Sequence, residues 1–511
     1  MLKQILSFFS SETQVAERLE NRIAKFHINW DKWNQRLFWA LVVVLFVGFI
    51  IYIVAAATVL PFPYEFKGWA GDGFVYNAWM LTQGQNFYLD PLKEVSVTGC
   101  YTPGFQILTA PLIRVFGLKM WPGRVVAIAG LLLIWVLMYY IATRLTGKRI
   151  YGLISVGFLM ATYGAMKSHF DDIHPDSWCI AWGLLSLVMT EAAVKKRFWL
   201  IPAALAAALS YFTKQTGLSF AIAAILFLAI HRPLRAVIYT AILGVLLALG
   251  HLIGQALTGG MFWYYTIQCA MGQPIEWLMI PLCLYVLTST FIFGSVVFLY
   301  LLFDRPSSLS LTSIYALALP IVFFLYYGVT SIRWGGSPTS SFFPSIVLGS
   351  ILLASGLSYI RGHLFKTAPK GAFLLLILLL IQNGALLRKR PRTPGEAHYN
   401  TAAQIEDIVR NTPGEVLVFY RGSFEFLNDR RFYDNWGAMT CNVNWTDYSR
   451  LEGQITSRYF TRILIPKMAI DYWLKDQPLY KMLLENYDQE VVIGHPPWFR
   501  TTPMYVFHCK S

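Results

Sequence analysis

The residue best suited to acid–base chemistry is Asp72, which lies in a long connection between two apolar runs, residues 61–120. Asp72 opens a stretch, 74–83, that ends at a glycine, a pattern that predicts a short helix. Tyr76 follows Asp72 by four residues, so both side chains would share one face of this helix. A carboxylate there could accept the proton of an attacking hydroxyl group. The structural alternative for Asp72 is an N-cap of the same helix.

The same connection contains signals for a second helix, which Thr102 and Pro103 open and Gly117 ends. We therefore expect two short helices in this connection, which the topology below places on the outer surface of a membrane. The other acidic residues of the connection are expected to be solvated: Glu65, Asp90 and Glu94.

A second group of ionisable residues lies between two apolar runs, in the segment 167–176. Asp171 and Asp172 could bind a cation, orient a sugar hydroxyl or act as a base. His174 is a candidate for substrate binding, although a lone histidine is commonly structural. Asp176 follows a proline in the first turn of the next apolar run, where a carboxylate suits the helix dipole.

Two cations are candidates for binding a phosphate. Lys214 lies in a Lys-Gln-Thr-Gly sequence between two apolar runs and could pair with a phosphate as a point charge, or extend its ammonium group to the membrane interface. Arg333 precedes Trp334 and two glycines and could bind a phosphate with both arms of its guanidinium group, or contact a lipid headgroup.

The composition is that of a membrane protein. Of 511 residues, 56% are hydrophobic and 14% are charged, whereas soluble domains carry about 25% charged residues. The net charge of +14 does not indicate nucleic-acid binding, because the basic residues gather in the short connections between apolar runs. These residues are Arg144, Lys148, Arg149, Lys195, Lys196, Arg197, His231, Arg232, Arg235, Arg361, Lys366 and Lys370.

Placing the basic connections in the cytoplasm gives about eleven transmembrane helices, with the connection 61–120 outside. The predicted spans are 37–60, 121–142, 151–166, 177–194, 198–213, 217–230, 236–256, 278–302, 312–330, 341–359 and 371–387. Residues 1–36 form an amphipathic N-terminal arm in the cytoplasm, and 37–390 form the transmembrane domain. The run Arg388 to Arg392 fits this topology least well, since it would lie outside.

From residue 391 onward the pattern changes to short strand-like runs, at 417–420 and 463–466, that alternate with helical patterns. This alternation predicts an α/β module over 391–511. The fold class is thus a polytopic α-helical membrane protein with a C-terminal extracytoplasmic α/β module. The six cysteines have no zinc-site spacing, and a disulfide between Cys441 and Cys509 is possible in an oxidising compartment.

Several short motifs, in this order and on this side of the membrane, resemble those of the C-type integral-membrane glycosyltransferases. This superfamily includes protein O-mannosyltransferases, lipid A aminoarabinose transferases and arabinofuranosyltransferases. The motifs are Gly71-Asp72-Gly73-Phe74-Val75-Tyr76, Tyr88-Leu89-Asp90-Pro91, Tyr101-Thr102-Pro103-Gly104-Phe105, Gly123-Arg124, Lys214-Gln215-Thr216-Gly217 and Gly335-Gly336 with Phe342-Phe343-Pro344. The resemblance covers about residues 37 to 350.

The resemblance implies a transferase that moves a sugar from a polyprenyl phosphate to a hydroxyl group of a glycan, lipid or protein, with inversion at the anomeric carbon. It implies that Asp72 is the catalytic carboxylate. We assign substrate binding to Tyr76, Tyr101, Asp171, Asp172, His174, Lys214 and Arg333. The family's acidic motif in the second outer loop is here Asp171-Asp172 with His174, a departure that leaves a divalent cation possible and assigns no metal ligand.

The enzyme would be an integral protein of a bacterial or archaeal plasma membrane, with an extracytoplasmic active site and a role in glycan biosynthesis of the cell envelope. A transporter or flippase of a polar or lipid-linked substrate is the alternative, and so is a polysaccharide polymerase or ligase. Transporters commonly carry repeats and ionisable residues near the bilayer midplane. No repeat is visible here, and the charges stand at the ends of the apolar runs.

Overall fold

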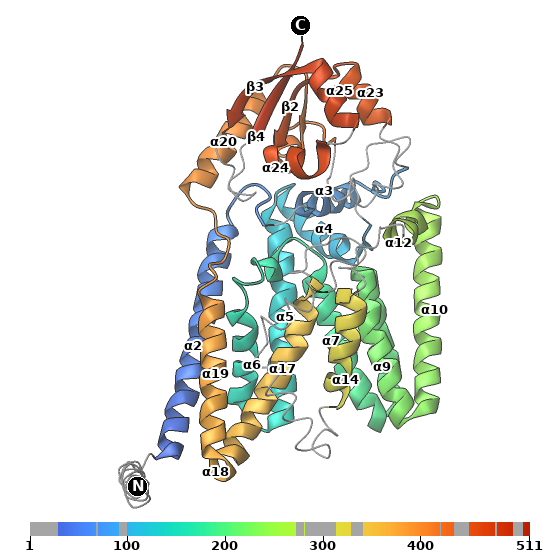
Figure 1. Cartoon of the computed structure of the whole chain (residues 1–511). Coiled ribbons are helices and arrows are strands. Elements are labelled where there is room, and N and C mark those ends of the chain that lie inside the picture. The colour runs from blue at the N-terminus through green and yellow to red at the C-terminus, as the bar shows by residue number, and fades with distance from the viewer. Residues whose placement is uncertain are drawn as a thin grey trace, which may run out of the picture.

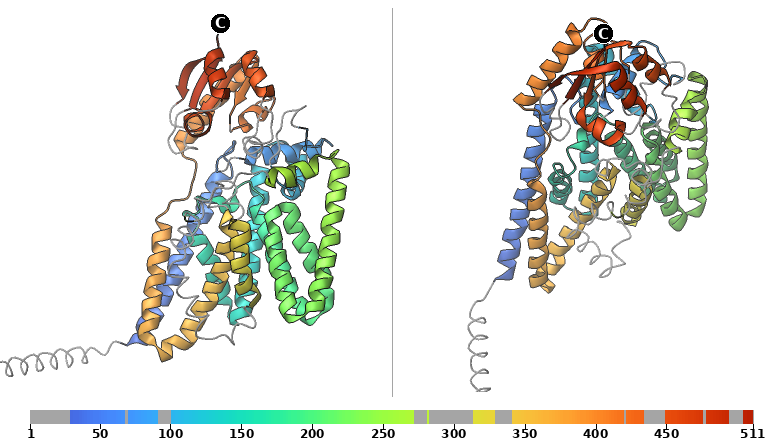
Figure 2. Two further views of the ribbon diagram at one scale, coloured as in Figure 1. Left: turned by 45° about the vertical axis from the view of Figure 1, so that its right-hand side comes forward. Right: turned by 45° about the horizontal axis from the view of Figure 1, so that its top comes forward.

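The computed structural model has a helical bundle at one end and a smaller α/β module at the other (Figure 1). The two further views show the same division (Figure 2). The structure describes residues 29–67, 70–90, 100–271, 281, 313–328, 341–419, 421–433, 449–475, 478–493 and 504–510.

The bundle consists of long apolar helices and two short helices near its upper end. The long helices run between the two ends of the bundle, so their connections alternate between the ends. Their bounds are α2 Trp30–Val59, α5 Trp121–Thr146, α6 Arg149–Ala161, α7 Asp176–Lys195, α8 Leu200–Thr213, α9 Leu218–His231, α10 Pro233–Leu257, α14 Ser313–Val322, α17 Phe343–Tyr359 and α19 Pro369–Leu387.

Six helices of the described part of the chain are long and apolar enough to cross a membrane. Every predicted span overlaps one of the helices above except 278–302, of which the structure describes residue 281 alone. α2 begins at Trp30, before the predicted span 37–60. The last part of the predicted N-terminal arm therefore belongs to this helix, and residues 1–28 lie outside the described residues.

The basic connections gather at the end of the bundle opposite the α/β module (Figure 1). The α5–α6 turn, the α7–α8 turn, the α9–α10 turn and the α17–α19 connection all lie there. The run Arg388 to Arg392 is the exception, and it lies at the module end. There the backbone N–H of Arg392 donates to Ser168 Oγ at 2.9 Å.

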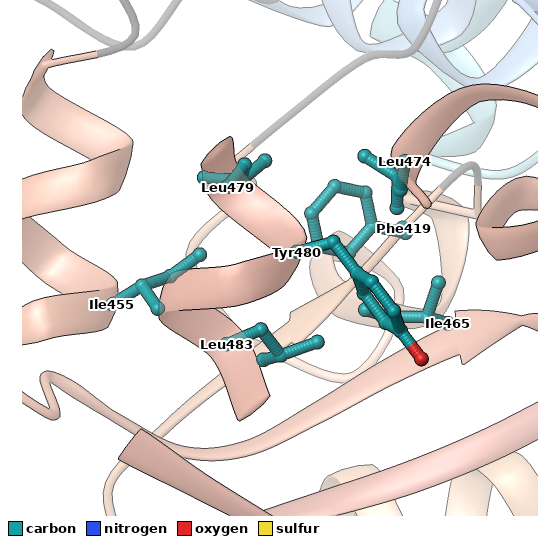
Figure 3. Close-up of a pocket in the computed structure, with 7 residues that line it drawn as sticks. All are labelled: Phe419, Ile455, Ile465, Leu474, Leu479, Tyr480 and Leu483. Atoms are coloured by element: carbon teal, nitrogen blue, oxygen red, sulfur yellow. The ribbon is translucent and has the colours of Figure 1, made fainter. Parts of the chain in front are cut away.

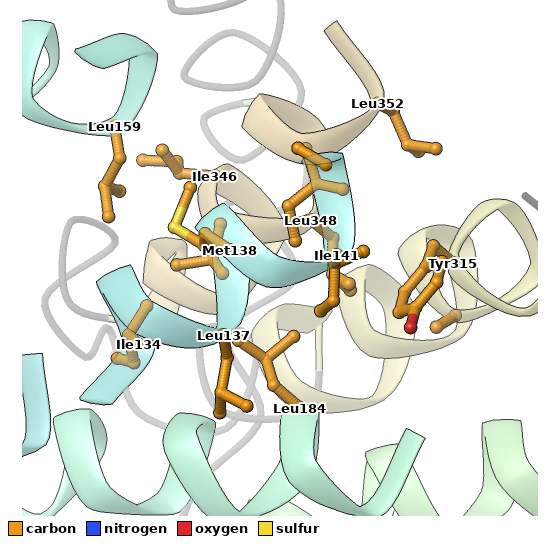
Figure 4. Close-up of a cluster of buried hydrophobic side chains, with 14 of the residues drawn as sticks. Ile134, Leu137, Met138, Ile141, Leu159, Leu184, Tyr315, Ile346, Leu348 and Leu352 are labelled. Carbon is orange, nitrogen blue, oxygen red and sulfur yellow. The ribbon is translucent and has the colours of Figure 1, made fainter. Parts of the chain in front are cut away.

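The bundle core is apolar and closely packed. Side chains of α5 such as Met138 and Ile141 meet Leu184 of α7 and Ile346 and Leu348 of α17 (Figure 4). Many apolar side chains on the outside of the bundle stay exposed, as expected for helices that face lipid.

The two short helices predicted for the first outer connection are present, and they lie between the bundle and the module (Figure 1). α3 is Gly71–Thr82 and α4 is Gly104–Phe116. Pro103 is the N-cap of α4, and Gly117 ends it with a φ of 80°, a conformation that glycine adopts without a Cβ clash. The predicted ends of α4 are thus confirmed, but Thr102 does not cap it, because its hydroxyl donates to the carbonyl of Tyr211 at 3.0 Å.

The C-terminal module contains a four-stranded sheet in the order β1-β2-β4-β3. β1 pairs with β2 in parallel, and the other two pairings are antiparallel. The predicted strand-like runs fall in or beside β1 and β2. The elements are α20 Glu396–Asn411, β1 Glu415–Val418, α21 Ser423–Phe426, α23 Ser449–Thr456, β2 Phe460–Pro466, α24 Lys467–Ala469, α25 Pro478–Asn486, β3 Tyr487–Ile493 and β4 Met504–Cys509.

The module is attached to the bundle by the segment that follows α2. Val59, Phe62, Tyr64 and Phe66 belong to the same apolar cluster as the core of the sheet. The ring of Tyr64 stacks on that of Phe424 with 3.9 Å between the centroids. Its hydroxyl group donates to Glu406 Oε2 at 2.6 Å. The first outer connection therefore forms part of the module's core.

Of the predicted disulfide, Cys441 lies outside the described residues. Cys509 lies in β4, and the bond stays a prediction.

The arrangement predicts that the module and the basic connections lie on opposite sides of the membrane. Gln404 of α20, at the module end, and Lys148 of the α5–α6 turn, at the opposite end, are both exposed. In intact cells, a membrane-impermeant maleimide should label Gln404→Cys above the parent protein and leave Lys148→Cys unlabelled. Both variants should react after lysis, which controls for accessibility. Equal labelling of the two in intact cells would contradict the arrangement.

Candidate active site

Asp72 lies in the first turn of α3 and faces the C-terminal module. Its side chain is 1% exposed. Asp72 Oδ1 accepts the backbone N–H of Gly73 at 2.9 Å, and the carboxylate also accepts the backbone N–H groups of Gly422 and Ser423. The N-cap position belongs to Ala70, without a side-chain cap. Asp72 is therefore not the N-cap of α3, and its hydrogen bonds join the first turn of this helix to the module.

Two further charged side chains are buried beside Asp72: Glu65 from the segment after α2, and Arg421 from the module. Each is 1% exposed. The expectation that Glu65 is solvated was wrong, because the module covers the segment that carries it. The positive charge of Arg421 interacts with Glu65, Asp72 and Asp172. We call these four residues the Asp72 cluster.

The electrostatics of the cluster suit a proton acceptor. Burial raises the pKa of Asp72 to about 6, although the charge of Arg421 and the backbone N–H groups lower it in part. Burial also raises the pKa of Glu65, and the charges of Asp172 and Asp72 add to this effect. A carboxylate whose pKa lies near the working pH is an effective general base, because it is ionised and still accepts a proton readily.

The neighbours Asp171 and Asp172 point to different partners. Asp171 forms a buried ion pair with Lys67 and accepts the hydroxyl of Tyr163 at 2.9 Å. Asp172 accepts the backbone N–H of Ile173 and lies 3.4 Å from His169 Nδ1. Burial would raise the pKa of Asp172, but the hydrogen bond and charge of His169 outweigh it and the pKa is lowered.

The different partners of Asp171 and Asp172 show whether this pair could bind the divalent cation that the sequence left possible. Asp171 is neutralised by an ammonium group, so the two carboxylates do not converge on one point. Among the described residues, no group of three or more His, Cys, Asp or Glu side chains is arranged to hold a metal ion. The acidic pair as it stands therefore does not fit a metal site.

Lys214 is the centre of a second group of side chains, which we call the Lys214 cluster: Lys214, Asp176, His174, Tyr101 and Tyr326. Lys214 Nζ donates to Asp176 Oδ1 at 2.7 Å, and Asp176 also interacts with His174 and with the hydroxyl of Tyr326. Lys214 lies over the rings of Tyr101 and Tyr326, 5.5 and 5.2 Å from their centroids. The ring of Tyr101 contacts that of His174 edge-on at 5.2 Å.

An ammonium group has three N–H donors, and Asp176 is the one hydrogen-bond acceptor that Lys214 contacts among the described residues. Lys214 thus keeps donors for a further anion. The Lys214 cluster adjoins the Asp72 cluster along the chain at two places. His174 follows Asp172 by two residues. Phe74 follows Asp72 by two residues, and its ring contacts those of Tyr101 and His174.

The structure thus brings Tyr101, His174 and Lys214 together, as a shared substrate-binding role requires. Tyr76 shares the face of Asp72 on α3, as predicted, but that face meets the module. Its ring packs on those of Phe426 and Phe432, at 5.4 and 4.9 Å. Arg333 lies outside the described residues.

Four buried residues of these surroundings were missed or set aside at the sequence level: Glu65, Lys67, Asp176 and Arg421. Asp176 was assigned to the helix dipole, although its place beside His174 was a usable signal. Arg421 had no signal in the sequence, because a single arginine in a turn-rich stretch is ordinary.

A separate small recess lies within the module (Figure 3). Its lining is apolar apart from the Tyr480 hydroxyl: Phe419, Ile455, Ile465, Leu474, Leu479, Tyr480 and Leu483. It offers no group for chemistry on a sugar or a phosphate, so it is not part of the site.

A family model described as dolichyl-phosphate-mannose-protein mannosyltransferase matches residues 101–256, which include Tyr101, His174 and Lys214. No curated protein matches the sequence.

Solved structures share the fold. ArnT from Cupriavidus metallidurans in the apo state matches with a TM-score of 0.56 and 11% identity, over 91% of this chain and 97% of ArnT. ArnT bound to undecaprenyl phosphate matches with a TM-score of 0.54 at 11% identity and the same coverage. The Archaeoglobus fulgidus oligosaccharyltransferase in the apo form matches with a TM-score of 0.54 and 12% identity, over 84% of this chain and 70% of that one. The fold is therefore that of the C-type membrane glycosyltransferases, and the resemblance predicted from the motifs is confirmed.

The buried Lys67–Asp171 pair yields a prediction about stability. Its side chains are 3% and 2% exposed, so Lys67→Met would leave an unpaired buried charge and cost about 3–5 kcal/mol of folding free energy. The double variant Lys67→Met/Asp171→Leu should recover much of this loss. Thermal unfolding in detergent measures both.

The matched control is Lys467→Met, which breaks an exposed pair with Asp471, 40% and 43% exposed. It should change the unfolding temperature little. An equal loss in Lys67→Met and Lys467→Met would show that burial does not govern the Lys67 pair.

Proposed function

We propose that this protein is a glycosyltransferase that transfers a sugar from a polyprenyl-phosphate donor to a hydroxyl group of a glycan, lipid or protein acceptor. The reaction takes place on the extracytoplasmic side, where the module also lies, in a bundle of about eleven spans. The observation that carries the proposal is Asp72, a buried carboxylate whose pKa is raised to about 6, in the C-type glycosyltransferase fold and beside a buried lysine cluster.

The chemistry follows from the two clusters. Asp72 accepts the proton of the acceptor hydroxyl while its oxygen attacks C1 of the sugar. The bond between C1 and the phosphate oxygen breaks, and the polyprenyl phosphate leaves with the electron pair. Attack from the face opposite the leaving group inverts the anomeric carbon.

Lys214 stabilises the negative charge that develops on the departing phosphate, and Arg333 is proposed for the same role. Tyr101 and His174, whose rings meet beside Lys214, contact the sugar. The bound lipid in one ArnT structure is undecaprenyl phosphate, and an archaeal oligosaccharyltransferase of this fold binds a dolichol-phosphate. Both support a polyprenyl phosphate as the donor's carrier.

The location of the charges favours an enzyme over a transporter. Asp72 lies in the first turn of α3, Asp176 is the first residue of α7, and Lys214 directly follows α8. All three are at ends of helices near the module, whereas transporters bind substrates near the midplane of the membrane.

The first test is the variant Asp72→Asn, assayed with mannose and other sugars on polyprenyl phosphate and a membrane extract as acceptor. Release of polyprenyl phosphate is measured. The amide keeps the shape of the side chain but cannot accept a proton, so turnover should fall at least ~100-fold while folding and undecaprenyl phosphate binding persist. Asp90→Asn, in the same connection and half-buried, is the control with near-normal turnover. A folded Asp72→Asn protein with normal turnover would remove Asp72 from the mechanism.

A second test concerns the leaving phosphate. The double variant Lys214→Met/Asp176→Asn removes the ammonium group without leaving its partner's charge buried. Since a hydrogen bond to a charged group contributes about 1.5–3 kcal/mol, undecaprenyl phosphate should bind about 10–100-fold more weakly, measured by its effect on thermal unfolding. Arg144→Met/Glu191→Gln removes an ion pair at the opposite end of the bundle and should bind the lipid normally. Unchanged binding in the Lys214 double variant would exclude the phosphate role.

A further inference from the structure

The C-terminal module contributes a buried arginine and two backbone N–H groups to the Asp72 carboxylate. Arg421 is among the largest fully buried side chains of the described residues. An arginine is seldom buried unless an opposite charge compensates it. Its compensating charges, Glu65, Asp72 and Asp172, all come from connections of the chain before the module.

The turn that carries Arg421 is built for a close approach to α3. A Cβ atom on Gly422 would lie 1.8 Å from Cε2 of Phe432, so only glycine fits there without displacing that ring. This fit lets the N–H groups of Gly422 and Ser423 reach Asp72. On the other side of the turn, Ser423 Oγ accepts the backbone N–H of Glu65 at 3.3 Å.

We propose that Arg421, with the N–H groups of Gly422 and Ser423, positions the Asp72 carboxylate and keeps it ionised, so that the C-terminal module completes the catalytic site. The proposal rests on the proposed function of Asp72 as the general base. Arg421 is a positioning residue, because it acts through Asp72 and not on the substrate.

The module does not depend on Arg421 for its attachment to the bundle. Tyr64 stacks on Phe424, Asn428 Nδ2 donates to the Tyr64 hydroxyl at 3.3 Å, and Tyr76 packs on Phe426 and Phe432. These contacts remain when the Arg421 side chain is changed, so a variant there tests the electrostatic role separately from docking.

The test is the pH dependence of kcat/KM, with the polyprenyl-phosphate sugar that turns over in the assay above. In the wild-type protein, activity should fall as the pH decreases through about 6, where Asp72 takes up a proton. We call this fall in kcat/KM at low pH the acidic limb. An opposite charge within ~4–6 Å lowers the pKa of a carboxylate by about 1–3 units. Arg421→Gln should therefore move the midpoint of the acidic limb at least about one pH unit higher. Below that midpoint kcat/KM should be about tenfold lower than in the wild-type protein, and it should recover at alkaline pH.

Other charged groups lie near Asp72 and Glu65. Changing the charge of one of these groups should move the acidic limb in a direction set by the sign of that charge. Glu65 adjoins Asp72, while Asp172 and Arg124 face Glu65 from the connection before α7 and from α5. Glu65→Gln removes a negative charge and should move the limb lower. Arg421→Lys retains the positive charge and should leave the limb near its wild-type position.

Arg430→Gln is the matched structural control. Arg430 is an arginine of the same module that donates to the carbonyl groups of Arg410, Thr412 and Gly414. Its loss should lower the unfolding temperature without moving the limb. If Arg421→Gln behaves like Arg430→Gln, with the wild-type limb, the positioning role is overturned.

Two outcomes separate this proposal from the proposed function. If Asp72→Asn keeps both turnover and the limb, the role of Asp72 fails, and that of Arg421 fails with it. If Asp72→Asn is inactive and Arg421→Gln has the wild-type profile, only the positioning role fails. If Arg421→Gln does not fold, Gly422→Ala takes its place: by displacing the N–H of Gly422 it should raise the limb, and an unchanged limb would overturn the proposal.

Discussion

The structure depends on one constraint, that a buried charge must have a partner of opposite charge. Glu65 and Asp72 are buried where the first outer connection meets the C-terminal module, and Arg421 of the module supplies the compensating charge. Without the module these carboxylates would face water, and their pKa values would lie near those of ordinary carboxyl groups. Docking of the module and burial of these two carboxylates are therefore one event.

The same constraint explains why the carboxylates of the two clusters differ in how far their charge is compensated. Asp72 shares one arginine with Glu65 and Asp172, so burial is only partly offset and its pKa stays near 6. Asp176, in contrast, has Lys214, His174 and a tyrosine hydroxyl as partners. One cluster thus provides a carboxylate that gains and loses a proton easily, and the other provides a fixed cation. An acceptor hydroxyl and a leaving phosphate need these two properties.

Much of the fold could be predicted because its signals are local. Apolar runs bounded by basic residues gave the helices of the bundle, and Pro103 and Gly117 gave the ends of α4. The shared face of Asp72 and Tyr76 followed from helical spacing. That this face meets the module, and not an open cavity, could not be predicted, because helical spacing sets which side chains share a face but not what covers it.

The sequence by itself determined the membrane class, the place of the outer helices and the candidates Asp72, Tyr101, His174 and Lys214, since hydropathy, caps and charge are properties of neighbouring residues. Only the tertiary structure decided which charges are buried and with whom. Glu65 and Asp90 are alike as acidic residues of one connection, yet Glu65 is buried and Asp90 half-buried. Asp171 and Asp172 are adjacent, yet they turn to Lys67 and to His169. The physical reason is that burial and ion pairing depend on contacts that form only when the chain has folded. Asp171 meets Lys67, 104 residues away, and the module covers Glu65.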